Sequence, residues 1–541
     1  MRHLLAFLAL LACAAPASAV ADDAVRAADR LMGTMAVDQP GAVVLVTRGT
    51  ENLYSKAFGA ADLEQGTPIT PETRFHVASV SKQFTALAVA LLAREGRLRL
   101  DEDIRVYLPE LPDFGTRIRV VDLLHHTSGL RDQWDLFSLS GTQIQSLLTQ
   151  QAILSLVRAQ RELNFPPGTE YRYSNTGYSL AAEIVARVSG MPFRRFVEER
   201  IFTPLGMRNS LIYDDAAQIV PRRAQSYALT RAGRLELRRL NFSNYGATSM
   251  MTTAADLQIW SRELIEPQVF APDLIRSLHA PTRLADGTAS NYGLGLYTAV
   301  VRGRTAVMHS GSDAGFRAVV ASFPVDRMSI VIVSNGSADM IPLYEGLTEI
   351  FVPGATVAAR EVTPDPLRLA RMAGYYASSW GSGLELRIDN GRLFRGTSAS
   401  ANPATFRADG TIEFSAPLTR FRLVEAAGGD VAGLEEMPVA GPPVRYDRVE
   451  RQSPSQADLQ ALAGRYRSAE LDITYTLGLA DGRLTLSSLQ SPEPVPLTPV
   501  GRDWFDMPFG RLLVQRAIDG RPDGLRVTSG RSRNLRFDRV D

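Results

Sequence analysis

The spacing of apolar residues changes along the chain from a helical period to a strand period. Apolar residues at i, i+3, i+4, i+7 and i+8 run from Phe84 to Leu92 and predict a helix over about residues 80–95, which stops at Gly96. Strands near both ends, with helices between them, predict an α+β domain over residues 20–355. The helical patterns cover 142–160, 178–190 and 254–266, and the strand-like runs cover 41–46, 53–58, 305–308, 317–323 and 328–334.

The last third of the chain is predicted to be all-β. Residues 352–366 contain three prolines and little periodicity, which is typical of a linker. Beyond them, short alternating segments are separated by Gly, Asn and Asp turns, as in a barrel or sandwich. The repeat described next predicts two copies of one small β domain, at residues 367–450 and 457–541. Segments 369–376, 390–393 and 445–449 recur at 459–466, 481–484 and 536–540, at an offset of 90 or 91 residues.

The N-terminus has the features of a secretory signal peptide over residues 1–19. A basic start precedes an apolar run over residues 4–15, and Ala17-Ser18-Ala19 forms an A-x-A cleavage pattern. The run is too short for a membrane anchor. A lipoprotein site at Cys13, the only cysteine, is the alternative, which Leu11 suits poorly. We therefore expect cleavage after Ala19, a secreted or periplasmic protein, and a mature chain without disulfides.

Composition and charge narrow the class of function. Of the residues, 45% are hydrophobic and 22% are charged, and the net charge is +1. This near-neutral balance without a basic run argues against nucleic-acid binding, which needs a positive patch. No later segment is apolar for long enough to span a bilayer. We expect a partner that is a small molecule or a short peptide, and the oligomeric state stays open.

Lysine is rare in this chain, and one lysine follows a serine by three residues. The chain holds 59 basic residues, of which only Lys56 and Lys82 are lysines. A buried lysine can lose its proton whereas arginine stays charged, so a lysine base has no arginine substitute. Lys82 stands one helical turn after Ser79, at a predicted helix N-terminus that favours an oxyanion. The alternative is a chance Ser-x-x-Lys with Ser79 as a helix cap. Lys56 is expected to be a solvated strand residue.

Two further motifs follow in the order and separation of a known family. Tyr173-Ser174-Asn175 comes after a Pro-Pro-Gly turn, and His309-Ser310-Gly311 comes after a strand-like run. Together with Ser79-Val80-Ser81-Lys82, they resemble the Ser-x-x-Lys, Tyr-x-Asn and Lys/His-x-Gly motifs of penicillin-recognising serine hydrolases. That group includes class C β-lactamases, D-alanyl-D-alanine carboxypeptidases, D-aminopeptidases and related esterases. The resemblance covers about residues 37–340 and is supported by segments 123–130, 204–207 and 291–295.

The resemblance implies a fold and three catalytic roles. The fold would be an antiparallel sheet flanked by helices, with a helical subdomain. Ser79 would attack a carbonyl group and become acylated. Lys82 and Tyr173 would share the proton transfer, with Tyr173 as the base in deacylation. Tyr173 as a buried aromatic with a satisfied hydroxyl is the alternative. We expect no cofactor and no metal, because the adjacent His125 and His126 diverge and have no acidic partner at ligand spacing.

The resemblance also implies a set of substrate-binding residues. Asn175 would hydrogen-bond the substrate amide, and His309 would replace the usual lysine of the third motif. Gly311 and Ser312 would continue that motif, and the backbone N–H groups of Ser79 and Ser312 would form the oxyanion hole. Alternatives are Asn175 as the cap of a helix that begins at residue 176, and His309 as a strand-end residue packed on the core.

The third motif and the two repeats together set the expected function. Histidine is a weaker, pH-dependent positive charge than lysine, which argues against strong β-lactamase activity. One catalytic domain followed by two similar β domains resembles the D-aminopeptidase layout, which implies that both β domains are all-β barrels. In that layout a barrel loop enters the active site and helps to recognise a free amine. We expect an amide or ester hydrolase that acts through an acyl-enzyme on Ser79 and has a D-aminopeptidase-like substrate. An esterase, a weak β-lactamase or a slowly acylated penicillin-binding sensor protein are the alternatives.

Overall fold

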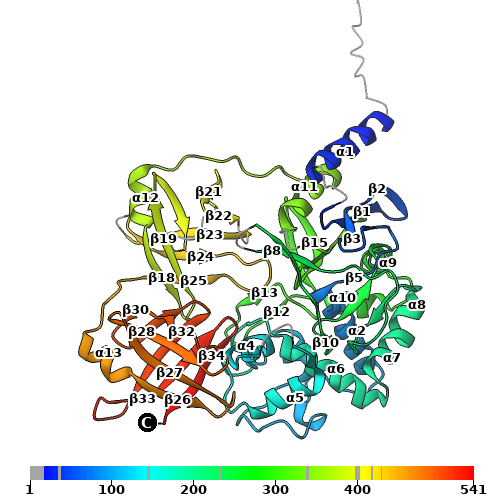
Figure 1. Ribbon diagram of the computed structural model, residues 1–541. Coiled ribbons are helices and arrows are strands. Elements are labelled where there is room, and N and C mark those ends of the chain that lie inside the picture. The colour runs from blue at the N-terminus through cyan, green and yellow to red at the C-terminus, as the bar shows by residue number, and fades with distance from the viewer. Residues whose placement is uncertain are drawn as a thin grey trace, which may run out of the picture.

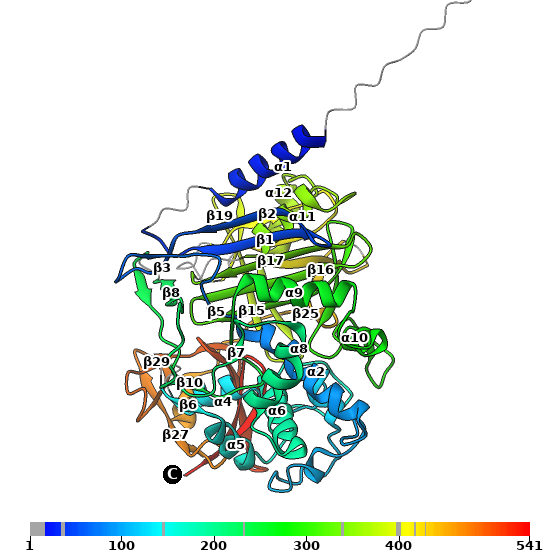
Figure 2. The same cartoon turned by 90° about the vertical axis from the view of Figure 1, so that its right-hand side faces the viewer.

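A six-stranded antiparallel sheet forms the centre of the N-terminal part (Figures 1 and 2). The structure, a computed structural model, describes residues 17–33, 38–142, 146–230, 233–336, 340–396, 402–415, 418–427 and 429–540. The strands predicted from the sequence are confirmed. The first strand of the chain pairs with the last strand of this sheet, and the second strand pairs with the first at the sheet edge. In spatial order the strands are β14 (Tyr297–Val301), β15 (Arg304–Asp313), β16 (Phe316–Phe323), β17 (Met328–Ser334), β1 (Ala42–Arg48) and β2 (Glu51–Phe58).

Both faces of this sheet are buried, because its strands carry apolar side chains on both sides. In β1, Val43 packs into the core on one side and Val44 into the core on the other, since side chains alternate along a strand. Helices α1 (Ala17–Met32) and α11 (Ile341–Phe351) cover one face of the sheet. Helix α9 (Ala254–Ile265) packs on the other face, whose core is continuous with that of the helical subdomain.

The helical subdomain is built around α2, which is buried on nearly all sides. Leu87, Ala88 and Val89 occupy successive positions of this helix and are all fully buried. The helix packs against α6 and against α10, which lies near the sheet. Its helices are α2 (Ser81–Arg94), α3 (Val120–Leu124), α4 (Gln133–Leu139), α5 (Gln150–Ala159), α6 (Asn175–Ser189), α7 (Phe193–Val197), α8 (Thr203–Leu205) and α10 (Pro272–Leu278).

One predicted helix begins later than expected. Residues 143–145 lie outside the described residues, and Leu148–Thr149 forms the short strand β6. The helix α5 starts at Gln150, because the side chain of Thr149 caps it by accepting the N–H of Ala152 at 3.1 Å. Other short strands of this part are β3 (Ala60–Asp62), β4 (Thr67–Pro68), β8 (Tyr227–Leu229), β9 (Leu235–Leu237), β10 (Phe242–Ser243), β12 (Thr282–Arg283) and β13 (Ala289–Ser290).

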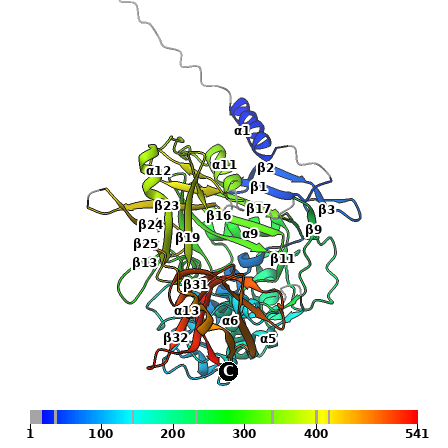
Figure 3. The same ribbon diagram turned by 60° about the vertical axis from the view of Figure 1, so that its left-hand side comes forward.

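The C-terminal part forms two nearly closed all-β barrels, which lie beside the N-terminal part (Figures 1 and 3). We name them barrel 1 and barrel 2. The α+β fold followed by two barrels is therefore confirmed. Barrel 1 comprises α12 (Pro366–Met372), β18 (Gly374–Ser378), β19 (Gly383–Asp389), β20 (Arg392–Arg395), β21 (Ala404–Phe406), β22 (Ile412–Ser415), β23 (Leu418–Glu425), β24 (Val431–Glu436) and β25 (Val444–Val449). Barrel 2 comprises α13 (Gln456–Leu462), β26 (Gly464–Ser468), β27 (Ile473–Ala480), β28 (Arg483–Ser488), β29 (Val495–Pro496), β30 (Thr498–Gly501), β31 (Trp504–Met507), β32 (Gly510–Arg516), β33 (Pro522–Ser529) and β34 (Ser532–Arg539).

The sequence repeat corresponds to repeated contacts in the two barrels. The hydroxyl of Tyr376 donates to the carbonyl of Met372 at 2.8 Å, and that of Tyr466 donates to the carbonyl of Leu462 at 2.9 Å. Arg448 stacks on the first tyrosine ring, at 5.9 Å from its centroid, and Arg539 stacks on the second at 5.7 Å. Each arginine thus ties the last strand of its barrel to the helix that opens it.

The predicted signal peptide is only partly within the described residues. Residues 1–16, including Cys13, lie outside them, and the described chain begins with α1 at Ala17. The predicted export, cleavage and lipoprotein alternative therefore stay predictions. Within the described residues, no helix combines the length and the hydropathy that crossing a membrane would require.

Candidate active site

Ser79 lies on a short 3₁₀ turn, Ala78–Val80, that runs directly into α2. The strand β5 (Phe75–His76) leads into this turn and pairs with β11 (Met250–Thr252), which also pairs with β7 (Leu211–Ile212). The side chain of Ser81 fixes the turn, because its hydroxyl donates to the carbonyl of Ala78 at 2.6 Å and accepts the N–H of Met250 at 3.0 Å. Ser79 is therefore held at a helix N-terminus, as predicted.

Lys82 is fully buried one turn beyond Ser79. Its Nζ lies 3.0 Å from Ser79 Oγ, 2.8 Å from Asn175 Oδ1 and 2.7 Å from the carbonyl oxygen of Ala247. Burial and the nearby positive charge of Arg531 lower the pKa of Lys82 well below its usual value, against the opposing effect of two carboxylates. The neutral amine is thus favoured in the position where a base would act.

Asn175 is oriented by a buried carboxylate that the sequence did not single out. Asp132 Oδ2 accepts the backbone N–H of Asn175 at 2.7 Å and its side-chain Nδ2–H at 2.8 Å. Because the amide nitrogen faces Asp132, the amide oxygen faces Lys82. Asn175 is the first residue of α6, and Ser174 is its N-cap. The alternative that Asn175 caps a helix beginning at residue 176 is therefore wrong by one position.

Tyr173 stands between the nucleophile and a buried histidine. Its hydroxyl interacts with the Ser79 side chain, and Lys82 Nζ lies 4.9 Å from the centroid of its ring. The ring packs on His126, with 4.2 Å between the ring centroids. Burial raises the pKa of Tyr173 above its usual value, although Ser79 and Arg531 oppose the shift. The hydroxyl therefore keeps its proton in the resting site.

His309 is a neutral residue here, not the weak positive charge expected from the sequence. Its Nδ1 lies 2.6 Å from the carbonyl oxygen of Ser310, which can only accept, so Nδ1 carries the proton. The bare Nε2 then accepts the hydroxyl of Tyr292 at 3.0 Å. Burial and the neighbouring Lys82 lower the pKa of His309 to about 3. Removal from water disfavours the charged form, so the imidazole is uncharged at neutral pH.

The strand β15 passes beside the serine turn at Gly311. A Cβ atom there would lie 2.2 Å from the carbonyl oxygen of Val77, so glycine is required for this close approach. The pairing of β14 with β15 ends at Met308, and residues 309–313 of β15 pair only with β16. One edge of β15 is therefore open beside Ser79. Ser312 lies on this stretch and is exposed.

A cavity of about 590 Å³ brings most of the predicted residues together. Ser79, Tyr173, Asn175, His309 and Ser312 line it, whereas Lys82 is buried behind the nucleophile and Gly311 packs against the serine turn. The sequence analysis missed several lining residues, because they carry no motif. These are Trp134, Thr248, Tyr297, Asp313 and Ala314 of the catalytic part, Val439 and Ala440 of barrel 1, and Arg531 of barrel 2. Ser310, the middle residue of the third motif, also lines the cavity.

Equivalent connections of the two barrels reach this cavity. Residues 437–443 join β24 to β25 in barrel 1, and residues 530–531 join β33 to β34 in barrel 2. Ala440 and Arg531 are 91 residues apart, the same offset that separates Arg445 from Arg536 in the repeat. Each barrel thus contributes its last hairpin to the wall beside Ser79, which the sequence repeat alone could not place.

The hairpin of barrel 2 is fixed to the catalytic part by main-chain contacts. The N–H of Arg531 donates to Asp135 Oδ2 at 2.5 Å, and Arg172 donates to the carbonyl of Gly530 at 2.6 Å. The hydroxyl of Ser532 accepts the N–H of Asp132 at 3.0 Å. The guanidinium of Arg531 lies 5.4 Å from the centroid of the Tyr173 ring. This turn is therefore part of the active-site structure.

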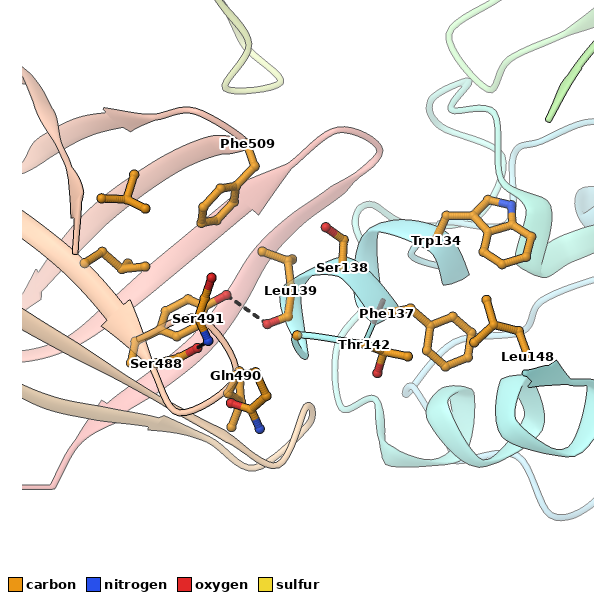
Figure 4. A pocket seen from close by; sticks show the side chains of 15 residues that line it. Trp134, Phe137, Ser138, Leu139, Thr142, Leu148, Ser488, Gln490, Ser491 and Phe509 are labelled. Atoms are coloured by element: carbon orange, nitrogen blue, oxygen red, sulfur yellow. Dashed lines mark hydrogen bonds between the residues drawn. The ribbon is translucent and has the colours of Figure 1, made fainter. Parts of the chain in front are cut away.

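A second cavity, of about 650 Å³, lies between α4 and barrel 2 (Figure 4). Trp134 and Leu139 come from the catalytic side, and Ser488, Gln490 and Phe509 come from barrel 2. Trp134 also lines the cavity at Ser79, so the two cavities share a wall.

Among the described residues, no group of three or more His, Cys, Asp or Glu side chains is arranged to hold a metal ion.

Comparisons with known proteins bear on the family and the fold of the chain. A family model described as Beta-lactamase matches residues 26–343, which is more than half of the chain. The chain is 26% identical over 527 residues to a D-aminopeptidase of Brucella canis, covering 93% of this chain and 96% of that protein. It is 28% identical over 376 residues to Penicillin-binding protein 4* of Bacillus subtilis, covering 65% of this chain and 82% of that protein. The octameric penicillin-binding protein homologue from Pyrococcus abyssi has the same fold, with a TM-score of 0.54 and 20% identity over 83% of this chain and 94% of that chain.

Proposed function

Because this chain belongs to the beta-lactamase family and is a serine hydrolase, we propose that it cleaves an amide or ester bond through an acyl-enzyme on Ser79. The observation that carries the proposal is the buried amine of Lys82, whose Nζ lies 3.0 Å from Ser79 Oγ. Burial lowers the pKa of this lysine well below its usual value. A neutral amine at this distance is within reach of the hydroxyl proton.

The hydrogen-bond partners of Lys82 support a base role. A neutral amine has two N–H groups and one lone pair. Two acceptor oxygens, Asn175 Oδ1 at 2.8 Å and the carbonyl of Ala247 at 2.7 Å, take the two N–H groups. The lone pair is then left for the Ser79 hydroxyl. Asp132 sustains this arrangement, because it fixes which atom of the Asn175 amide faces the lysine.

The proposed reaction uses these groups in two steps. In acylation, Ser79 Oγ bonds to the substrate carbonyl carbon while its proton moves to Lys82 Nζ. The proton then passes through the Tyr173 hydroxyl to the leaving nitrogen or oxygen. The raised pKa of Tyr173 favours this relay over a standing phenolate. In deacylation, water attacks the ester carbon and passes one proton through the Tyr173 hydroxyl to Lys82. The bond between the acyl carbon and Ser79 Oγ then breaks, and the proton moves from Lys82 to Ser79 Oγ.

The remaining predicted residues have binding roles in this proposal. The backbone N–H groups of Ser79 and Ser312 form the oxyanion hole at the open edge of β15. Asn175 and the Gly311 segment hold the amide or ester group beside the nucleophile. Neutral His309 supports the strand through Tyr292 and supplies no charge to the substrate. The proposed mechanism therefore uses no positive charge from His309.

For the substrate, we propose a short peptide, amide or ester that contains a D-amino acid. The full-length similarity to a protein named D-aminopeptidase supports this class. A general esterase or a weak β-lactamase of the same family uses the same serine chemistry and differs only in the acyl group. A slowly acylated sensor protein is the alternative from another functional class, because it would stop at the acyl-enzyme.

The test combines labelling with turnover. Intact-protein mass spectrometry is expected to find a fluorophosphonate probe on Ser79 of the wild type and no label on Ser79→Ala. Steady release of p-nitrophenol from an ester supports the hydrolase, whereas a single stoichiometric burst supports the sensor. Failure to label position 79 in the folded wild type contradicts the acyl-enzyme.

The base role has its own variant and a matched control. Lys82→Arg keeps the charge but removes the titratable amine, so we expect kcat/KM to fall about a hundredfold or more. Lys56→Arg changes the only other lysine, which lies half-exposed on β2 and pairs with Asp29 at 2.6 Å. This control is expected to match the wild type. Retention of more than about a tenth of the rate in Lys82→Arg contradicts the role of Lys82 as base.

A further inference from the structure

The cavity at Ser79 contains a cation that barrel 2 supplies. Arg531 lies between β33 and β34, and 34% of its side chain is exposed. Its N–H donates to Asp135 Oδ2 at 2.5 Å, and the next residue, Ser532, binds the N–H of Asp132 at 3.0 Å. These contacts hold the turn at Arg531 and at the residue that follows it. The guanidinium is therefore presented to the cavity by an ordered turn.

The guanidinium has hydrogen-bonding capacity left for a ligand. Its Nη1 lies 3.5 Å from Asp132 Oδ2, which is longer than an ordinary N–H···O hydrogen bond. That carboxylate oxygen already accepts two shorter hydrogen bonds, at 2.7 and 2.8 Å, from Asn175. Arginine offers five N–H donors in a planar fork that matches a carboxylate. A carboxylate in the cavity would thus find donors that Asp132 does not saturate.

The importance of this cation depends on the charges of the other ionisable groups in the cavity. Among the described residues that line the cavity, Arg531 is the only arginine or lysine. His309 is neutral because burial lowers its pKa to about 3. Asp313 also lines the cavity, and its Oδ2 accepts the hydroxyl of Thr248 at 2.8 Å. Burial raises the pKa of Asp313 to about 6, so at neutral pH it is mostly ionised and repels an anion from its own side.

We propose that Arg531 binds an anionic group of the substrate, so that the enzyme selects amides or esters that carry a carboxylate. The inference rests on the proposed acyl-enzyme function and narrows its substrate class. The layout of the chain implied recognition of a free amine by a barrel loop, and a guanidinium repels an ammonium group. The selectivity is therefore the reverse of that expectation. A peptide C-terminus and an acidic side chain are the two sources of such a carboxylate.

The first experiment measures the selectivity of the wild-type enzyme with matched substrate pairs. N-acetyl-D-Ala-D-Ala against its C-terminal amide tests a terminal carboxylate. The p-nitroanilides of N-acetyl-D-Glu and N-acetyl-D-Gln test a side-chain carboxylate. We expect kcat/KM to be about tenfold to a hundredfold higher for the acid in one pair. The pair that shows the difference identifies the source. Ratios at or below one in both pairs, or no turnover of any member by an enzyme that hydrolyses neutral esters, overturn the inference.

The second experiment assigns the selectivity to Arg531. Arg531→Gln removes the charge and is expected to lower the acid-to-amide ratio about tenfold or more, whereas Arg531→Lys lowers it less. Asp313→Asn removes a negative charge from the same cavity and is expected to raise the ratio. Arg536→Gln, on the neighbouring strand β34 with an exposed partner in Asp538, is the control and keeps the wild-type ratio.

Comparing ratios separates selectivity from a general loss of activity. If Arg531→Gln lowers kcat/KM equally for acid and amide, the arginine only supports the site and the inference is wrong. If Arg531→Gln does not fold, the substrate pairs measured with the wild type and the Arg531→Lys variant still test the inference. Ser79 labelling distinguishes the two proposals: a labelled enzyme with unselective ratios contradicts only the role of Arg531, whereas an unlabelled enzyme contradicts the acyl-enzyme.

Discussion

The two barrels share one sequence repeat but contact the catalytic part in different ways. The hydrophobic core of barrel 2 includes Leu136 and Leu139 of α4, so it continues into the helical subdomain. The core of barrel 1 consists of its own side chains. The comparison teaches that alternating apolar residues suffice to build each barrel, whereas a few residues on its surface and turns decide how it is used.

The ion pairs that join each barrel to the catalytic part differ in the same way. Barrel 2 is joined to the catalytic part by Arg131 and Glu470, which are 2.7 Å apart and have side-chain exposures of 0% and 6%. Barrel 1 is joined by Arg420 and Glu345 at 2.8 Å, where the arginine is 28% exposed. Glu345 also pairs with Arg302, so it does not depend on barrel 1 alone. We expect barrel 2 to be energetically coupled to the active site and barrel 1 to be nearly independent of it.

The largest effect is expected at the buried ion pair. Arg131→Met leaves Glu470 buried without its cation, which costs about 3–5 kcal/mol in the free energy of unfolding. Arg420→Met is the matched change in barrel 1 and costs about 1 kcal/mol or less, because Arg302 still pairs with the glutamate. Urea denaturation of the full chain measures both values. Equal losses for the two variants would show that the barrels are docked with similar strength.

A smaller effect is expected from substituting Asp132, which contacts both the barrel 2 hairpin and Asn175. Asp132 is a positioning residue, so Asp132→Ala is expected to lower kcat about a hundredfold with little change in KM. Asp132→Asn keeps an acceptor oxygen and is expected to recover part of the loss.

The control for Asp132 lies in barrel 1 and has the same capping role. Asp365 caps α12 by accepting the N–H of Leu367 at 3.0 Å, as Asp132 caps α4. Asp365→Ala is expected to cost about 1 kcal/mol of stability and to leave kcat unchanged. A parallel fall of kcat in both variants, or an unaffected Asp132→Ala, contradicts the positioning role.

The smallest effect is a shift in the pH profile. Lys82 acts as a base only when neutral, so kcat/KM falls as the pH drops through the pKa of Lys82. The positive charge of Arg531 lowers that pKa, and its removal raises it. We therefore expect the acidic limb of the profile to move to higher pH in Arg531→Met, while Ala440→Met at the equivalent position of barrel 1 leaves it in place. A limb that stays fixed or moves to lower pH contradicts electrostatic coupling from barrel 2.

Much of the fold and the proposed nucleophile could be predicted because they depend on local patterns. Ser79 and Lys82 are one helical turn apart. The apolar residues that follow them keep a helical period, which places the serine and the lysine on the same face. The strands of the central sheet were visible as apolar runs. The start of α5 was not, because the cap at Thr149 interrupts a pattern that continues to look helical.

Other parts of the site left no local trace. Asp132 resembles an ordinary helix cap in the sequence, and only the fold places its second oxygen against Asn175. Burial lowers the pKa of His309, and burial is not visible from a His-x-Gly motif. These features depend on contacts between residues that are far apart in the chain.

The sequence by itself determined the α+β fold, the two barrels and the serine–lysine pair, because backbone periodicity and spacing within one helical turn act locally. Only the tertiary structure decided that the last hairpins of both barrels line the cavity beside Ser79, and that one places alanine there and the other arginine. The physical reason is that local patterns specify which elements form, whereas docking depends on complementary surfaces and charges hundreds of residues apart.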